Sequence, residues 1–220
     1  MPGMGTTPGA PWITGQVEML EALLGFVDAV IPGERVTVVG VSWGGYMALG
    51  PVRAIGARLD GLMLTAPEVR AEGRDRHLPP RLVLHQDPAI EGELGPTERM
   101  WARLAVIQDP RTLAAFRAGV KPGLEVADWD FLGRVGARYP AGVIEDRPPW
   151  PLHAPALVLT GRHDVAVGYL DGWPLPEDLT RGTYAVLDGA GHGVGEEQPG
   201  LFRVLAGERL ARVEAFAAEA

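Results

Sequence analysis

Cysteine is absent from this chain of 220 residues, and its absence excludes three kinds of chemistry. Without thiols the protein forms no disulfide, carries no cysteine nucleophile and holds no metal through sulfur. Positive charge is also scarce, because 20 Lys and Arg stand against 28 Asp and Glu, for a formal net charge of −8. That balance disfavours nucleic acid and anionic membrane surfaces as partners.

Long apolar runs are missing as well. No uncharged stretch reaches the ~18 apolar residues that a membrane-spanning helix needs. The first residues also lack the basic region followed by an apolar run that marks a signal peptide. We therefore expect a cytoplasmic protein with no membrane partner. Hydrophobic residues make up 46% of the chain, enough for a folded core, and the length suits one domain with an insertion.

The most informative segment is G-V-S-W-G at residues 40–44, which ends a valine-rich run that begins at Val36. A nearly continuous apolar run is typical of a parallel strand that is buried on both faces. The residues from Trp43 onward have the pattern of a helix. Strand, G-x-S-x-G and helix together predict a nucleophile elbow, in which glycines two before and two after Ser42 relieve crowding at a strained turn. The alternative is a glycine-rich turn with an incidental serine.

Two later segments end in side chains suited to acid–base chemistry. The apolar run P-A-L-V-L-T at residues 155–160 is followed by G-R-H-D, which contains Asp164, and T-Y-A-V-L at 183–187 is followed by His192. Because the carboxyl ends of parallel strands meet at one edge of a sheet, we expect both side chains to lie near the serine. Asp171 and Asp188 compete for the carboxylate position, and Asp164 is favoured because it directly follows its strand.

The motifs G-V-S-W-G-G, L-T-G-R-H-D and G-A-G-H, in this order, resemble those of the α/β-hydrolase fold superfamily. The resemblance implies that Ser42 attacks an acyl carbonyl, that His192 takes its proton, and that Asp164 orients the imidazole. It also implies that the backbone N–H of Trp43 stabilises the oxyanion. The alternative for His192 is a surface turn. His163 beside Asp164 lacks the further ligands of a metal site, so we expect no metal.

The resemblance implies an α/β fold, a mostly parallel sheet flanked by helices. Residues 1–66 and 155–220 would form the hydrolase core, and residues 67–154, rich in Arg, Pro and Glu, match the helical cap of this family. We expect the cap to contain short helices that prolines separate. The expected strands are 35–41, 61–65, 155–160 and 183–187, and the expected core helices are 15–31, 43–59, 174–179 and 201–218.

Aromatic residues of the expected cap are candidates for lining an apolar substrate pocket: Trp101, Phe116, Trp129, Phe131 and Tyr139. Packing within the small core of the cap is the competing interpretation for most of them. The substrate-binding residues are therefore unknown at this stage. His77 and His85 receive no role.

Only 41 residues precede Ser42, whereas the family carries several strands before its nucleophile and takes a second oxyanion donor from the loop after the third strand. No H-G motif of that loop precedes Ser42. We therefore expect an N-terminally incomplete fold in which strand 35–41 is an exposed apolar edge, able to pair with a second copy of the chain. A misassigned start, a gene remnant and a sheet completed by another chain are the open explanations.

The expected function is that of a serine hydrolase acting on a small acyl ester, thioester or C–C ketone substrate through an acyl-enzyme. Acyl transfer to an acceptor other than water is also open. No residue pattern requires a metal, nucleotide or flavin, so no cofactor is expected, and the expected partner is a small-molecule substrate. The alternative is a non-catalytic truncated remnant or an assembly subunit with the same fold.

Overall fold

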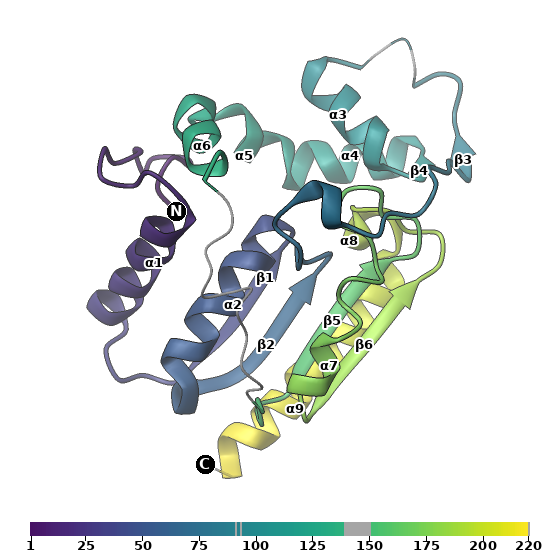
Figure 1. Cartoon of the computed structure of the whole chain (residues 1–220). Coiled ribbons are helices and arrows are strands. Elements are labelled where there is room, and N and C mark those ends of the chain that lie inside the picture. Colours follow the sequence, from purple (N-terminus) through teal and green to yellow (C-terminus); the bar gives the residue numbers. More distant parts are fainter. Residues whose placement is uncertain (91, 93, 139–150, 220) are drawn as a thin grey trace.

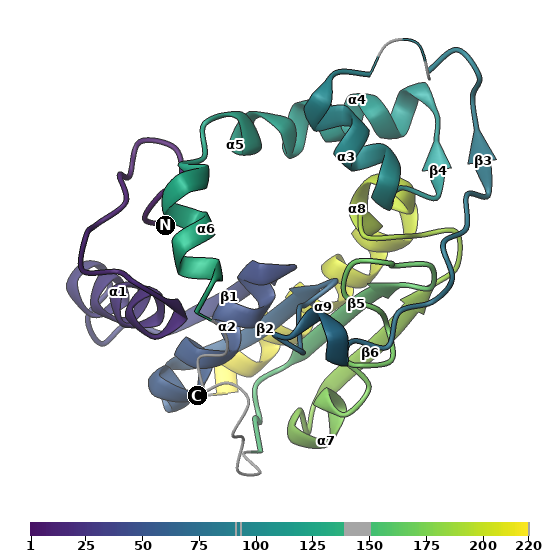
Figure 2. The same cartoon turned by 45° about the horizontal axis from the view of Figure 1, so that its top comes forward.

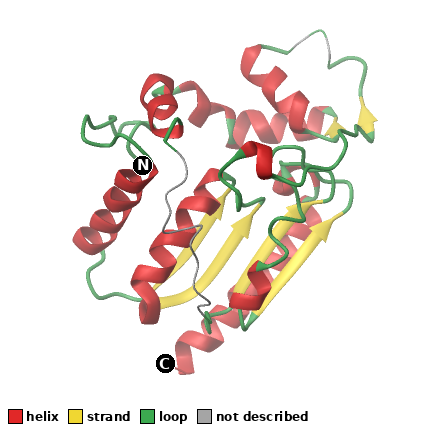
Figure 3. Cartoon of the chain, in the orientation of Figure 1, coloured by secondary structure: helices red, strands yellow, loops and turns green. Residues whose placement is uncertain are grey.

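The computed structural model describes residues 1–90, 92, 94–138 and 151–219. Within them, four strands form a parallel sheet in the order β1-β2-β5-β6, with helices on both faces (Figure 1, Figure 3). The strands are β1 (Val36–Val41), β2 (Leu59–Thr65), β5 (Ala156–Gly161) and β6 (Gly182–Leu187). The mostly parallel, helix-flanked sheet expected from the sequence is confirmed.

The helices of the core cover the two faces of this sheet. Residues Leu62 and Val158 of one face pack with Val52 of α2, whereas Met63 and Leu157 of the other face pack with α8 and α9. All six residues of β5 are buried, which explains its nearly continuous apolar sequence. The core helices are α1 (Gln16–Val30), α2 (Trp43–Ile55), α7 (Leu175–Asp178), α8 (Val194–Glu197) and α9 (Pro199–Glu219).

The register of the strands brings their carboxyl ends to one level. Val41 of β1 pairs with Thr65 of β2, and Thr65 in turn pairs with Leu159 of β5. At the next step, Gly161 pairs with Leu187 of β6. Loops that follow these four positions therefore start side by side, and the site described below is built from them.

Helix α2 is shorter than the helix expected at 43–59. It ends at Ile55, and Gly56 follows with φ of +44°, a left-handed conformation that glycine adopts more easily than other residues. A 3₁₀ turn at Gly56–Arg58 then leads into β2, which begins two residues earlier than the expected residue 61.

Residues 67–154, here called the insertion, carry the remaining described elements, which lie beyond the carboxyl ends of the strands (Figure 2). Pro96 and Pro110 stand at the first positions of helices instead of between them, because proline at that position loses no hydrogen bond. A short strand pair, absent from the sequence expectation, joins two loops. The elements are β3 (His85–Gln86), α3 (Pro96–Leu104), β4 (Ile107–Gln108), α4 (Pro110–Gly119), α5 (Lys121–Glu125), α6 (Trp129–Gly136) and a 3₁₀ turn (Gly73–Asp75).

The far end of the insertion is fastened to the start of the chain. Phe131 of α6 is buried in a cluster with Met19 of α1 and Met47 of α2. Its ring lies so close to the N-terminal loop that a Cβ on Gly3 or Gly9 would come within 2.4 and 2.5 Å of ring atoms. Glycine is required there because no side chain fits, and the N-terminal loop therefore follows the surface of the ring.

Strand β1 is the outer strand of the sheet as far as the described residues form it. On the face toward α9, Val39 and Val41 remain 60% and 55% exposed. An outer strand has backbone N–H and C=O groups without partners along its free edge. Exposed apolar side chains beside them favour association with another strand. None of the described helices is long and apolar enough to cross a bilayer.

Candidate active site

Ser42 occupies a strained turn between β1 and α2. Its backbone has φ of 53° and ψ of −122°, an unfavourable conformation for a residue with a side chain. Four backbone hydrogen bonds hold it there. Its N–H donates to Thr65 O at 3.0 Å, and its C=O accepts from the amides of Gly45 at 2.9 Å, Glu68 at 3.0 Å and Tyr46 at 3.2 Å. The neighbouring loop after β2 therefore helps to fix the conformation of the serine.

The glycines around Ser42 differ in how much space a side chain would find at each position. A Cβ on Gly40 would lie 2.5 Å from the carbonyl oxygen of Gly44, and a Cβ on Gly45 would lie 2.9 Å from Cα of Pro67. A Cβ on Gly44 would meet no atom within 4 Å. The interpretation that glycines two before and two after the serine relieve crowding is therefore right for Gly40 and wrong for Gly44. The crowded position on the helix side is Gly45, where α2 passes the loop after β2.

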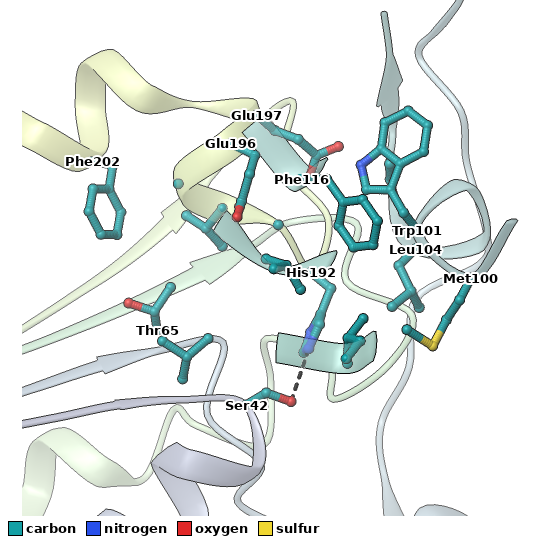
Figure 4. Close-up of a pocket in the computed structure, with 17 residues that line it drawn as sticks. Ser42, Thr65, Met100, Trp101, Leu104, Phe116, His192, Glu196, Glu197 and Phe202 are labelled. Carbon is teal, nitrogen blue, oxygen red and sulfur yellow. Dashed lines mark hydrogen bonds between the residues drawn. The ribbon is translucent and has the colours of Figure 1, made fainter. Parts of the chain in front are cut away.

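The three residues singled out in the sequence lie together at the carboxyl ends of the strands. His192 Nε2 is 2.9 Å from Ser42 Oγ (Figure 4), and His192 Nδ1 is 2.9 Å from Asp164 Oδ2. Asp164 is fully buried, and its other oxygen accepts the amides of Ala166 at 2.8 Å and Val167 at 3.1 Å. Both oxygens of the carboxylate are therefore fixed, and the imidazole is oriented toward the serine.

Neither of the competing carboxylates reaches His192. Asp171 is buried and accepts a hydrogen bond from the ring of His77 at 2.7 Å. The Asp188 side chain is 93% exposed and lies 3.4 Å from the ring of His163. Of the three carboxylates, Asp164, which follows its strand directly, is the one that contacts His192.

Five influences act on the pKa of His192. Burial alone would lower it, but the hydrogen bond and the charge of Asp164, together with the charges of Glu196 and Glu68, raise the pKa above its ordinary value of 6.5. A raised pKa means that the surroundings favour the imidazolium. The site therefore stabilises the charged histidine that forms when a neighbouring hydroxyl gives up its proton.

Trp43 is the first residue of α2, where backbone N–H groups have no acceptor within the helix. The partial positive charge of the helix start adds to the attraction of an anion at this point. The indole N–H of Trp43 donates to the side-chain oxygen of buried Gln16 at 2.9 Å. This bond holds the side chain against α1, so the amide of Trp43 keeps a fixed position beside Ser42.

A cavity of about 410 Å³ opens beside Ser42 and His192 (Figure 4). Most of its wall is apolar; part of it comes from the insertion, including Met100, Leu104 and Phe116, and the rest comes from the ends of β1 and β2 and from residues 192–202. Such a wall binds apolar groups by the hydrophobic effect. The insertion thus contributes apolar side chains to a cavity that Ser42 and His192 also line.

The five aromatic candidates for the pocket divide between its wall and other places. Trp101 and Phe116 line the cavity and pack on each other with ring centroids 6.1 Å apart. Trp129 is 57% exposed, and Phe131 is buried against the N-terminal loop. Tyr139 lies outside the described residues.

Sequence analysis missed Glu197, a buried carboxylate that joins the insertion to the histidine loop. It accepts the amides of Val106 at 2.6 Å, Ile107 at 2.9 Å and Gly191 at 2.6 Å. Burial raises its pKa, and the three amides oppose that rise without cancelling it. Nothing in the pair E-E at 196–197 separates this residue from its neighbour, because only the folded contacts distinguish them.

A family model and several similar solved structures point to the same protein family. The model of the alpha/beta hydrolase family matches residues 1–203. An alpha/beta superfamily hydrolase from Oenococcus oeni PSU-1 is similar in structure, with a TM-score of 0.89 at 21% identity over 97% of this chain and 80% of that one. Among curated proteins, no sequence matched significantly.

Two further solved structures share the fold. A thermophilic esterase from Thermogutta terrifontis has a TM-score of 0.61 at 21% identity, covering 97% of this chain and 78% of its own. The 2-hydroxy-6-oxo-6-phenylhexa-2,4-dienoate hydrolase from Rhodococcus sp. strain RHA1 has a TM-score of 0.65 at 18% identity, covering 95% and 77%. At these identities the likeness is one of fold.

Proposed function

Because this chain belongs to the alpha/beta hydrolase family, we propose that it is a serine hydrolase with Ser42 as its nucleophile. Family membership and the esterase and C–C hydrolase neighbours support hydrolase activity in general. The observation that carries the specific proposal is the pair of 2.9 Å contacts that joins Ser42 to His192 and His192 to Asp164. A serine, a base and an orienting carboxylate in this order are what acyl transfer requires.

In the proposed mechanism, Ser42 Oγ attacks the carbonyl carbon while His192 Nε2 takes the hydroxyl proton. Asp164 holds the proton on Nδ1 and stabilises the imidazolium. The amide of Trp43 donates a hydrogen bond to the oxyanion of the tetrahedral intermediate. His192 then gives its proton to the leaving group, and a water activated by the same base releases the acyl group from Ser42.

The proposed substrate is a small acyl ester, a thioester or a ketone cleaved at a C–C bond. Each has a carbonyl that the serine can attack, and the cavity of about 410 Å³ lies in the range of small-molecule sites. We assign the insertion the role of a cap that encloses the acyl group, since Trp101 and Phe116 of its helices line the cavity. The mechanism uses no metal or organic cofactor.

Reaction with a fluorophosphonate probe tests this function directly. Intact-mass measurement of the 220-residue chain should show one adduct, and the Ser42→Ala variant should show none. The variant tests for labelling of other hydroxyls, because it removes only the proposed nucleophile. A folded parent protein that takes up no probe would refute an activated serine.

A second candidate function is assembly without catalysis, favoured by the exposed Val39 and Val41 on outer strand β1. The proposed partner is a second copy of the chain, which would pair through the same strand. Light scattering during size-exclusion chromatography should then show a dimer that Val39→Lys converts into a monomer. A monodisperse monomer of the parent chain would count against this function.

A further inference from the structure

The described wall of the cavity has an unbalanced charge. It includes two neighbouring carboxylates, Glu196 and Glu197, and no lysine or arginine among the residues that the structure describes. Their surroundings differ. Glu197 is buried and its oxygens accept three backbone amides, whereas the side chain of Glu196 extends from α8 into the space between Phe202 and His192 (Figure 4). Glu196 is therefore the carboxylate that a bound ligand meets.

The lysine and arginine side chains of α4 and α5, two helices that line the cavity, contact groups other than the Glu196 carboxylate. Arg117 and Lys121 both contact the carboxylate of Glu98, at 2.7 and 3.0 Å. Arg111 donates to the backbone carbonyl of Glu196 at 2.7 Å. In the described part of the chain, no ion pair joins a lysine or arginine to that side chain.

The other acidic groups near the serine have partners of opposite charge or hydrogen-bond donors. Asp164 is bound to His192, and Glu68 forms an ion pair with Arg76 at 3.0 Å. The charge of Glu196 also reaches His192, because it is one of the causes that raise the pKa of that histidine. The cavity beside the serine therefore combines a mostly apolar wall with the Glu196 carboxylate, which has no ion-pair partner among the described lysines and arginines.

Resting on the proposed function, we propose that Glu196 makes this site selective for an uncharged acyl group and against substrates with a carboxylate near the reacting carbonyl. An anionic group would lose hydration against an apolar wall and would be repelled by the carboxylate. The proposal narrows the substrate class to esters, thioesters or ketones whose acyl part is neutral and apolar.

Two matched nitrophenyl esters test the proposal. The 4-nitrophenyl monoester of glutaric acid ends in a carboxylate, and 4-nitrophenyl 5-methylhexanoate has an isopropyl group of similar shape in its place. The measured quantity is the ratio of kcat/KM for the anionic ester to kcat/KM for the neutral one. Hydrophobicity alone affects this ratio equally in every variant, so a change between variants reports charge.

Glu196→Gln should raise the ratio about fivefold, and Glu196→Lys should raise it further, because the first removes repulsion and the second adds attraction across a partly screened distance. Glu214→Gln is the matched control. It removes the same charge from an exposed position near the end of α9, and should leave the ratio unchanged.

Ionic strength gives a measurement that requires no variant. Raising it from about 20 mM to about 500 mM should increase the ratio for the parent protein, because salt screens repulsion between an exposed charge and the ligand. If the Glu196 variants do not fold, a ratio independent of ionic strength overturns the proposal.

The failures of the two proposals can be told apart. Turnover of the neutral ester with the same ratio in the parent protein and in Glu196→Gln overturns charge selectivity and leaves the serine hydrolase intact. A parent protein that hydrolyses neither ester and takes up no fluorophosphonate overturns the proposed function and this inference with it.

Discussion

The carboxylate of Glu197 accepts a hydrogen bond from the amide of Gly191 at 2.6 Å. Gly191 immediately precedes His192, so this bond fixes the backbone from which the imidazole extends toward Ser42. The same carboxylate also accepts the amides of Val106 and Ile107, so one side chain sets the histidine loop and the adjacent part of the insertion together.

Replacing Glu197 should therefore impair the position of the base. Glu197→Gln keeps the shape of the side chain but turns one of its acceptors into an N–H₂ group that faces a backbone amide. We expect kcat to fall about tenfold with a smaller change in KM, and stability to fall by about 1–3 kcal/mol. Steady-state kinetics with a neutral ester and thermal unfolding measure both effects. Unchanged kcat in a folded variant would contradict a positioning role.

The raised pKa of His192 sets the pH dependence of the reaction. The base must be neutral to take a proton, so kcat/KM should decline as pH falls through the raised value, and the acid limb should lie above pH 6.5. Glu196→Gln should move that limb to lower pH because one of the charges that stabilise the imidazolium is gone. A pH profile with a neutral ester checks both, with Glu214→Gln as the control. An acid limb below pH 6.5 would be inconsistent with the described surroundings.

The three glycines of the serine turn should respond differently to alanine. Gly40→Ala and Gly45→Ala introduce Cβ atoms at 2.5 and 2.9 Å from backbone atoms, so both should displace the turn and abolish labelling of Ser42 by fluorophosphonate. Gly44→Ala meets open space and lies within α2, so it should keep the fold and gain up to about 1 kcal/mol in helix stability. Circular dichroism during thermal unfolding distinguishes the three variants. A loss of stability in Gly44→Ala would show that the turn is more crowded than described.

Asp171 should stabilise the fold, although it does not reach His192. Its buried carboxylate accepts hydrogen bonds from His77 at 2.7 Å and from Arg70 at 2.8 Å. Asp171→Asn should cost about 2 kcal/mol, whereas Asp188→Asn, at a side chain that is 93% exposed, should change stability by less than about 0.5 kcal/mol.

The effect of Asp171 should also depend on pH. Burial opposes ionisation, but the hydrogen bonds from His77 and Arg70 outweigh it and hold the pKa below 3.8 in the folded state. A depressed pKa contributes stability above the unfolded value that is lost as pH falls. The difference in unfolding free energy between the parent and Asp171→Asn should therefore shrink below about pH 4. A difference that is constant from neutral to acidic pH would argue against an ionised carboxylate.

The strands and the proximity of Ser42, Asp164 and His192 could be predicted because their sequence signals are local. Each parallel strand is a short apolar run, and Ser42, Asp164 and His192 follow such runs within a few residues, so the register of the sheet brings them together. The details around them depend on contacts between distant segments. Gly45 is crowded by Pro67, and Glu197 is buried by residues about 90 positions earlier in the chain. No spacing in the sequence carries that information.

The insertion was harder to predict for a related reason. Its prolines indicate boundaries between elements, but the same residue suits the gap between two helices and the first turn of one, as Pro96 and Pro110 show. Its aromatic residues also serve two purposes. Trp101 faces the cavity and Phe131 faces the N-terminal loop, and side-chain type alone does not separate these uses.

The packing of the Phe131 ring against Gly3 and Gly9 affects whether the protein stays together after its chain is cut. Two of the contacts that hold the insertion lie far apart along it, at α6 with the first residues of the chain and at β4 with Glu197. A protease that cuts the exposed chain around Val126, between those points, would leave each piece docked on the sheet. The nicked protein would then migrate as an intact one until a denaturant separates its fragments.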